Sequence, residues 1–534
     1  MGFYLVQGGS TLKQMSTGGT LTSVTIPTGI TLDATKRLRG VVIGSVAVLF
    51  NSPSQNLAID RFAVARPLAP PVPTAVQILA DGAAGSLSGT YRVRCTFIIK
   101  DDFGNILSES SMGPVSSAFA ITTQYLKVDS TLPVCPITIT GIARRVYRTT
   151  TGGDTYFPWI DVDGNTVTSV QDDMSDEALQ LVAAPTDLGT PPPFELAVAW
   201  KDRLWAKSGF AKDILSYSGV NRPFAMASSQ QFPIPPRDTD TRGITGLLSR
   251  QDELGVGRAD SFHKIAGSST ENFTRYTVAE GIGIWAPDSC QVIHDIGYFF
   301  GNPFGIYTWG PDGITNISNE RVRDWFESDT YFNRGQFDKA VGSYYPELHA
   351  YVLNLCGVGS TDLNRWVMYD INSKSWWGPH VTAEFTPTGI YTVKDANNTP
   401  MMVMTATNGR VYKSQSTKSD DSPSIATTNA PDFDCETNWF SGGTPGVNKT
   451  WLEPTISTKI LADAGAVLQL IPRIGKLDAS AGTTINHDMT KGIERLRRLG
   501  HGEFLQLRIR QDVDGIDVVL YGIEIPFFEN GERR

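Results

Sequence analysis

The residues that most often carry catalysis lie scattered through this chain, without the spacing that catalysis requires. No G-x-S-x-G nucleophile turn, H-E-x-x-H zinc motif or G-x-x-x-x-G-K-[ST] phosphate loop occurs in the 534-residue sequence. The six histidines are isolated from one another: His263, His294, His349, His380, His487 and His501. The five cysteines form no C-x-x-C pair and are expected to be buried, reduced thiols: Cys95, Cys135, Cys290, Cys356 and Cys435. We therefore predict no bound metal or cofactor and no enzymatic activity.

Two Asp-rich segments resemble fragments of calcium-binding loops. These are DVDGN at 161–165 and DVDGID at 512–517. Neither is followed by the glutamate that closes such a loop, and neither has flanking helices. We interpret both as hairpin turns; weak surface calcium sites are the alternative. Sialidase-type S-x-D-x-G-x-x-W boxes are absent as well.

Basic residues gather near the end of the chain. The segment KGIERLRRLGHGEF and the run after it contribute six cations: Lys491, Arg495, Arg497, Arg498, Arg508 and Arg510. A solvated face is one interpretation of this cluster. The alternative is a charged interface with an acidic neighbouring subunit or with nucleic acid.

Aromatic residues are the remaining candidates for a binding site. In NRWVMYDINSKSWWGPH (364–380), we predict a strand with Trp366, Met368 and Tyr369, a turn at 372–374, and a second strand anchored by Trp376 or Trp377. Large aromatic side chains suit the interface between two packed sheets. Packing is the favoured interpretation. The alternative is a ligand pocket formed by exposed tryptophans: Trp285, Trp309, Trp376 and Trp377.

The elements that carry these residues repeat along the chain. Five apolar runs begin 44 to 52 residues apart between 194 and 415, and each is followed by a turn and a second amphipathic strand: DRLWAKS at Asp202, DELGVGR at Asp252, IGYFFGN at Ile296, LHAYVLN at Leu348 and TPMMVMT at Thr399. A sixth copy, SVAVLFN at Ser45, lies in residues 1–66. A period of about 40–50 residues with several short strands is typical of a propeller blade. The sequence predicts a β-propeller of roughly six blades, although five or seven are also compatible.

Proline-rich segments divide the chain further. RPLAPPVPTA and APTDLGTPPPF flank residues 67–193, which are predicted to form a β-sandwich of the fibronectin or immunoglobulin type inserted after the first blade. A polar Ser/Thr/Asp-rich stretch then precedes residues 430–534. There, FLQLRIRQ and YGIEIPFF alternate apolar and polar residues, as half-buried antiparallel strands do. We predict a second sandwich-like domain and an all-β protein overall.

Composition supports this class and limits the partners. The chain has 51 glycines, 31 prolines and 19% charged residues, which favours many turns over long solvated helices. Its net charge is −9, so the protein as a whole is not a basic nucleic-acid clamp. No stretch approaches 18 consecutive apolar residues, so we expect no membrane-spanning segment.

The order of these modules resembles the β-propeller tail proteins of tailed bacteriophages. The similarity is to the tail nozzle, or tail tubular protein B, and to the packaged-DNA-stabilisation hub of short-tailed phages. It rests on VTIPTGI, LAIDR before RPLAPPVPTA, GIARRVYRTTTGG in the insert, AVAWKDRLWAKSGFAKDILSYSGVNRPFAM, ITGLLSRQDELGVGRADSFHKIAG, FGIYTWGPDGITNISNERV, RLRRLGHGEFLQLRIR and YGIEIPFFENGERR.

The resemblance implies a virion protein that is assembled in the host cytoplasm. It implies a ring, typically hexameric, below the portal and adaptor, which encloses the channel for exiting double-stranded DNA. Its expected neighbours are the portal-adaptor complex, other tail proteins, and tail fibres or spikes. The family offers no catalytic residues to carry over. Two other interpretations stay open: a receptor- or carbohydrate-binding propeller, and a polysaccharide-degrading enzyme with two carboxylates in a cleft.

Overall fold

A computed structural model describes residues 3–51, 55–179, 182–236, 240–382, 385–413, 433–437, 439–443, 447–458, 467–476, 479–511 and 520–529. The chain divides into two compact units, Met1–Val411 and Tyr412–Arg534. Antiparallel strands dominate both units, which confirms the predicted all-β class. The helical elements of the described residues are short: α1 (Asp176–Leu179), α2 (Arg323–Glu327), and the 3-10 turns η1 (Pro287–Ser289), η2 (Arg334–Lys339), η3 (Pro346–Leu348) and η4 (Met489–Lys491).

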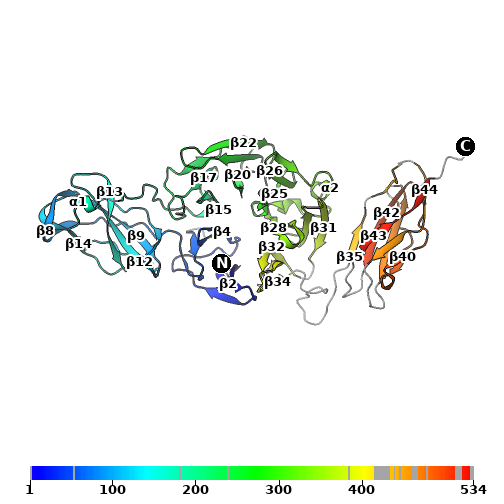
Figure 1. Ribbon diagram of the computed structural model, residues 1–534, viewed down its shortest axis with the longest axis horizontal. Coiled ribbons are helices and arrows are strands. Elements are labelled where there is room, and N and C mark those ends of the chain that lie inside the picture. Colours follow the sequence, from blue (N-terminus) through cyan, green and yellow to red (C-terminus); the bar gives the residue numbers. More distant parts are fainter. Residues whose placement is uncertain are drawn as a thin grey trace. The chain divides into compact units, whose positions relative to one another are not determined.

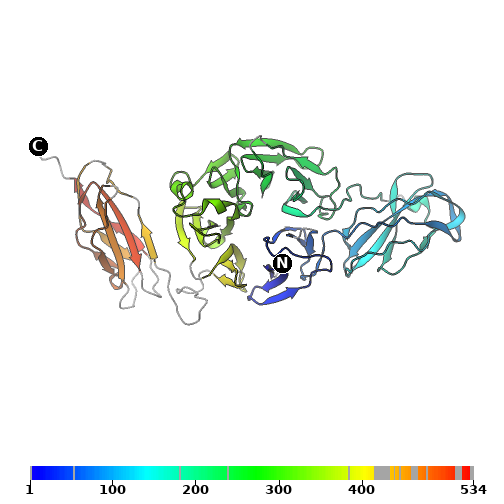
Figure 2. The same cartoon turned by 180° about the vertical axis from the view of Figure 1, so that it is seen from behind.

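A ring of antiparallel sheets forms most of the first unit, as the two opposite views in Figures 1 and 2 show. The described residues form seven such sheets. From the second sheet to the seventh, an inner strand of each sheet packs against an inner strand of the next around the centre. In chain order the sheets are β1 (Phe3–Gly8), β2 (Thr11–Ser16), β3 (Leu21–Val24); β4 (Arg39–Ile43), β5 (Val46–Phe50), β6 (Leu57–Ile59), β7 (Ala65–Pro67); β15 (Phe194–Trp200), β16 (Arg203–Ser208), β17 (Ile214–Tyr217), β18 (Gln231–Pro233); β19 (Ile244–Ser249), β20 (Glu253–Arg258), β21 (Ser261–Ala266), β22 (Thr274–Glu280); β23 (Gly283–Ile284), β24 (Gln291–Ile293), β25 (Ile296–Asn302), β26 (Gly305–Gly310), β27 (Gly313–Asn316); β28 (Val341–Tyr345), β29 (Ala350–Leu355), β30 (Arg365–Asp370), β31 (Ser375–Val381); and β32 (Pro387–Lys394), β33 (Pro400–Ala406), β34 (Val411–Lys413).

The predicted repeat corresponds to six of these sheets. Each of the six apolar runs provides the strand that is second in the hydrogen-bonded order of its sheet: β5, β16, β20, β25, β29 and β33. These strands are central in their sheets and largely buried, which explains why their sequences are the most apolar of each repeat. The sheet β1–β3 was not part of the repeat. It joins the ring beside β32, where Lys394 N donates to the Tyr4 hydroxyl.

The stretch 364–380 forms the predicted pair of strands. Strand β30 ends at Asp370, whose carboxylate accepts hydrogen bonds from the backbone N–H of Asn372 and Ser373, and Lys374 adopts a positive φ of 53°. The chain then returns as the outer strand β31. The Trp376 ring packs against Tyr369, with 4.8 Å between ring centroids. This part of the stretch is a packing device, as predicted.

The insert is a two-sheet sandwich. Its strands are β8 (Leu79–Tyr91), β9 (Val93–Lys100), β10 (Ile106–Glu109), β11 (Phe119–Val128), β12 (Ile142–Thr149), β13 (Tyr156–Asp163) and β14 (Val170–Asp172). One sheet has the order β10-β9-β12-β13 and the other β14-β11-β8. Side chains of both sheets share one core, in which Tyr91 and Leu126 meet Cys95 and Val146. Two antiparallel sheets around one shared core form the β-sandwich that the sequence predicts for the insert.

The second unit is also built from short antiparallel strands around one core. Its strands are β35 (Phe433–Glu436), β36 (Lys449–Trp451), β37 (Thr455–Thr458), β38 (Val467–Gly475), β39 (Ile485–Asp488), β40 (Ile493–Arg495), β41 (Gly500–Gly502), β42 (Phe504–Gln511), β43 (Leu520–Glu524) and β44 (Phe527–Glu529). On β42 the predicted alternation holds: Leu505, Leu507 and Ile509 are buried, whereas the residues between them are half-buried. Near β44 it fails, because Phe527 is exposed.

Candidate binding site in the central cavity

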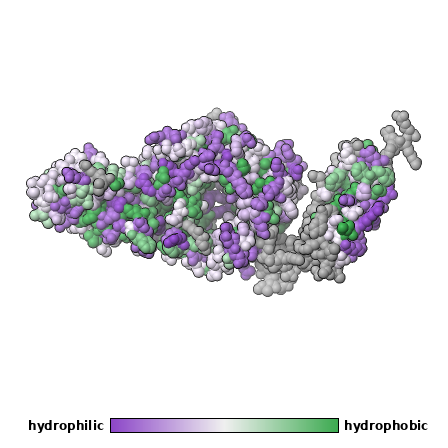
Figure 3. Space-filling model, viewed as in Figure 1, coloured by the Kyte–Doolittle hydropathy of each residue, from purple (hydrophilic) through white to green (hydrophobic). Residues whose placement is uncertain are grey.

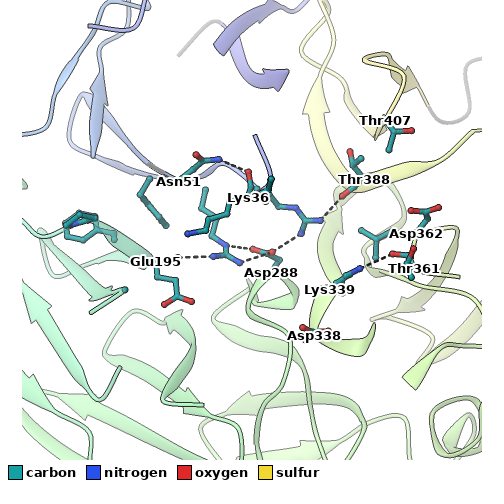
Figure 4. A pocket seen from close by; sticks show the side chains of 18 of the residues that line it. Lys36, Asn51, Glu195, Asp288, Asp338, Lys339, Thr361, Asp362, Thr388 and Thr407 are labelled. Atoms are coloured by element: carbon teal, nitrogen blue, oxygen red, sulfur yellow. Dashed lines mark hydrogen bonds and ion pairs between the residues drawn. The ribbon is translucent and has the colours of Figure 1, made fainter. Parts of the chain in front are cut away.

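A cavity of about 820 Å³ lies at the centre of the propeller (Figure 4). It is lined by the starts of inner strands β4, β15 and β32 and by the segments around η1 and η2. Hydrophilic side chains gather around the central hollow in the face drawn in Figure 3. The lining contains four acidic and four basic residues, so its formal charges balance: Glu195, Asp288, Asp338, Asp362, Lys36, Arg37, Arg39 and Lys339.

Asp288 is the centre of an ion-pair network across this cavity. Its Oδ1 lies 2.6 Å from Arg39 Nε, and its Oδ2 lies 2.8 Å from Arg37 Nη1. Arg39 Nη2 makes a further bond of 3.1 Å to Oδ2, so the Arg39 pair is bidentate. The two arginines come from the β4 segment and Asp288 from η1 in the β23–β27 sheet. The network therefore joins two sheets that are not neighbours in the ring.

Both guanidinium groups also donate hydrogen bonds to backbone carbonyls. Arg37 donates to the Thr388 carbonyl at 2.7 Å, and Arg39 donates to the Glu195 carbonyl at 3.0 Å. Burial disfavours the charged form of Asp288, but the hydrogen bond from Arg39 and the charges of both arginines outweigh it and lower the pKa of this carboxyl. Asp288 is therefore ionised at neutral pH and does not serve as a general acid.

The other three carboxylates of the cavity differ in whether they form ion pairs. Glu195 forms an ion pair with the buried Lys207. Asp338 and Asp362 line the cavity, and Lys339 between them donates to the Thr361 carbonyl at 3.3 Å. Among the described residues no ion pair reaches Asp338 or Asp362. These two carboxylates are among the groups of the cavity that a polar ligand could contact directly.

The four candidate ligand-facing tryptophans do not form one exposed cluster. Trp309 is only 1% exposed and stacks with Arg250 and Phe262, so its assignment as a ligand-facing residue is corrected. Trp285 is half-buried under the Arg242 guanidinium, 4.3 Å from its ring centroid. Trp376 is half-buried against Trp325 of α2, with 6.3 Å between ring centroids. Trp377 alone of the four is exposed, at 53%.

The six predicted basic residues all lie in the second unit, where they differ in their contacts and burial. Lys491 pairs with Glu494, and Arg495 pairs with Glu453. Arg497 donates to the carbonyls of Thr483 and Thr484, and Arg498 is exposed. Arg508 and Arg510 are half-buried on β42. Lys491, Arg495 and Arg497 are thus engaged by intramolecular contacts, whereas no hydrogen bond or ion pair from a described residue reaches the exposed Arg498.

The described calcium-like turn is occupied by ion pairs, and the described cysteines are buried or half-buried. Asp161 accepts a bidentate pair of bonds from Arg145 and also contacts Lys100, so its carboxylate is already neutralised. The segment 512–517 lies outside the described residues. Cys95, Cys135 and Cys356 are buried, Cys290 is half-buried, and the Cys435 side chain also lies outside them. Nowhere in the described ranges do three His, Cys, Asp or Glu side chains gather as a metal site requires.

The network at Asp288 could not be found from sequence spacing. Arg39 and Asp288 are separated by 249 positions, and neither belongs to a recognisable motif. The one available signal was the charged pair Arg37 and Arg39 immediately before an apolar strand, in KRLRGVVIG. A charge at the start of a first strand is what an inner, cavity-lining position would show.

Comparisons with known proteins give no family for this chain. No protein-family model and no curated protein sequence matches it. Among solved structures, the N-terminal domain of Nup159 has 9% identity and a TM-score of 0.34, with 77% of this chain and 85% of that chain covered. PorZ of Porphyromonas gingivalis has 8% identity and a TM-score of 0.26 (98% and 80% covered), and the exo-β-1,3-galactanase of Phanerochaete chrysosporium has 8% and 0.17 (92% and 95% covered).

Because these TM-scores lie below 0.5, the likenesses carry no argument about what the protein does. In the described part of the chain, no helix has the length and apolarity needed to cross a bilayer.

Proposed function

We propose that this chain is a structural virion protein of a tailed bacteriophage. In this proposal it forms an oligomeric ring, hexameric by resemblance, in the tail below the portal and adaptor, where it retains packaged DNA and conducts it during ejection. The observation that carries the proposal is the module order. Two sheets of the ring, an inserted fibronectin-like sandwich, five further sheets of the ring and a C-terminal β-domain follow one another in the chain, an order that resembles the module order of the family named above.

The central cavity supports a non-catalytic role for the propeller. Asp288 is bound by two arginines and Glu195 by Lys207, so two of its four carboxylates are neutralised. Cross-ring ion pairs stiffen the ring of sheets, which suits a building block of an assembly. A cavity bridged in this way does not admit duplex DNA. The proposed DNA path is therefore the axis of the subunit ring, not the axis of the propeller.

The net negative charge of the chain supports a channel through which DNA passes without binding tightly to the protein. A protein that neutralises phosphates with many cations releases counterions and binds DNA strongly, whereas this chain carries a net charge of −9. An acidic wall would let the duplex slide. Strong binding of duplex DNA by the assembled ring at physiological salt would contradict this part of the proposal.

Electron microscopy of mixtures with candidate portal-adaptor rings tests the proposal. The proposal expects ring-shaped averages that stack coaxially on the adaptor, with the tail fibres or spikes as further partners in the complete tail. Failure to form rings with any adaptor, at concentrations where both proteins are folded, would reject it.

A carbohydrate- or receptor-binding propeller is the second candidate. Two observations favour it: the carboxylates of Asp338 and Asp362 in the central cavity, and the exposed Trp377. Carboxylates can accept hydrogen bonds from sugar hydroxyls, and an exposed aromatic ring can stack on a sugar. Trp377 lies on the outer strand β31 and does not line the cavity, so the two features would be separate contacts. Glycan-array binding that is lost in Asp338→Asn, Asp362→Asn or Trp377→Ala would favour this candidate over the tail ring. Turnover of a polysaccharide would instead make the protein an enzyme.

A further inference from the structure

A second cavity, of about 500 Å³, lies where the inserted sandwich meets two sheets of the propeller. The β4–β7 sheet, strand β10 of the insert and the loop after β17 all line it. Ser108 of β10 donates to the Leu68 carbonyl at 2.7 Å and connects the insert to the propeller beside it. The lining is mostly apolar, with a few polar groups, and includes Val46, Arg66, Leu68, Ile106, Glu109 and Phe224. This volume and composition are typical of small-molecule sites.

Arg66 is the unusual member of this lining. It lies on β7, opposite Ala58 of β6, and is only 6% exposed. No hydrogen bond or ion pair reaches its side chain from any described residue; Asp60 attracts its charge from a longer range. A guanidinium that is this enclosed and has no protein acceptor is costly, because only the little water that the cavity holds can solvate it. Its five donors are therefore available to an acceptor inside the cavity.

Glu109 is the second ionisable group of the lining and is 5% exposed. Tyr147 donates to its Oε1 at 2.5 Å and Thr96 donates to the same atom at 2.8 Å. Burial raises the pKa of Glu109, although these two hydrogen bonds oppose the shift. Glu109 is therefore easier to protonate than an exposed glutamate, and its Oε1 is already occupied by these two donors. Arg222, also in the lining, is paired with Asp187.

We infer that this cavity binds a small organic carboxylate with an apolar body. The ligand's carboxylate accepts hydrogen bonds from Arg66, and its body lies among Val46, Leu68 and Phe224. An arginine presents donors in a fork that matches both oxygens of a carboxylate, and such charge-assisted bonds are strong away from water. The apolar residues around it disfavour highly hydrated anions such as phosphate.

Ligand-observed NMR and thermal denaturation of the full chain test this inference. The probes are 3-phenylpropionate, hexanoate and 4-methylpentanoate, each paired with its own uncharged amide. We expect saturation transfer to at least one carboxylate and a melting temperature that rises with its concentration, with no response to the matching amide. An amide that binds as well as its carboxylate would overturn the inference, as would the absence of binding by all three carboxylates.

Variants locate the site. Arg66→Met should weaken carboxylate binding about tenfold or more. Without ligand it should keep or raise the melting temperature, because it removes an unpaired buried charge. Arg61→Met is the matched control: this exposed arginine lies in the turn between β6 and β7, over the Phe62 ring, and its loss should leave binding unchanged. Equal carboxylate binding by Arg66→Met and by the wild-type protein would overturn the inference.

If Arg66→Met does not fold, the variant Leu107→Trp tests whether the carboxylate binds in this cavity. Leu107 is half-buried in the lining, so an indole at this position fills the cavity from the insert side without removing a charge. We expect a folded protein that no longer binds the carboxylate. Undiminished binding in this variant would place the ligand elsewhere and would overturn the inference.

Discussion

Arg39 and Asp288 form an ion pair across the centre of the propeller, with 2.6 Å between Arg39 Nε and Asp288 Oδ1, although 249 positions separate them in the chain. Arg37 reaches the same carboxylate, and both guanidinium groups also bind backbone carbonyls of other sheets. The centre of the ring is thus a polar joint. It holds together sheets that do not pack directly on one another.

The first prediction concerns this joint. Asp288→Asn removes the charge that two arginines share, while it keeps the size of the side chain. Because it leaves two cations in a poorly solvated place, we expect a loss of about 3 kcal/mol in the free energy of unfolding. Chemical denaturation measures this loss. Asp338→Asn is the control, because Asp338 lines the same cavity without an ion pair among the described residues, and it should change stability by less than about 0.5 kcal/mol. Equal effects of the two variants would contradict the assignment.

The pH dependence of stability follows from the same carboxyl. The pKa of Asp288 is lower in the folded protein than its ordinary value of 3.8. Its contribution is therefore complete at pH values above 3.8 and is lost as the pH falls through the folded pKa. The difference in the free energy of unfolding between wild type and Asp288→Asn, measured by denaturation between pH 7 and pH 3, should be constant near neutral pH and should shrink as the pH falls below 3.8 toward 3. A difference that stays constant over this range would show that the charge of Asp288 is not responsible.

Glu109 is expected to behave in the opposite way. Burial raises its pKa above the ordinary value of 4.5, so its ionisation opposes folding as the pH rises from 4.5 through the folded pKa. A glutamine can still accept the hydrogen bonds of Tyr147 and Thr96. We predict that Glu109→Gln is at least as stable as wild type at pH 7 and loses this advantage below pH 4.5, measured by urea denaturation. A large destabilisation at pH 7 would show that the charged form is required.

The adjacent tryptophans of β31 provide a matched pair. Trp376 packs between Tyr369 and Trp325, whereas Trp377 is 53% exposed. Trp376→Ala should cost about 3 kcal/mol, because it removes buried aromatic contact area and leaves a cavity. Trp377→Ala should cost less than about 1 kcal/mol. Thermal denaturation separates the two, and a reversed order would contradict the packing role of Trp376.

Much of the fold could be read from the sequence because its strands carry local signals. The central strand of each repeat is buried on both faces, so runs such as IGYFFGN are apolar throughout and recur at a fixed period. Turn residues mark the insert, where Gly104 and Gly152 take positive φ values in the hairpins after β9 and β12. The sheet β1–β3 was missed as a separate sheet because its strands are mostly half-buried or exposed and do not share the repeat.

The sites depended on information that the sequence does not contain. Trp309 and Trp377 are chemically identical, yet one is enclosed and the other exposed, because their strands occupy different positions in their sheets. In the sequence, nothing distinguishes Arg66 from an ordinary exposed arginine at the end of a blade. In the folded chain it is buried, and it lines the cavity between the insert and the propeller.

Mass photometry of the purified protein, alone and mixed with candidate portal-adaptor rings, tests the central claim most directly. A ring protein of the phage tail should give a species near six times the monomer mass of 58.2 kDa, either alone or on the adaptor. A monomer that persists at 58.2 kDa and ignores every adaptor ring would contradict the claim and would favour the ligand-binding propeller.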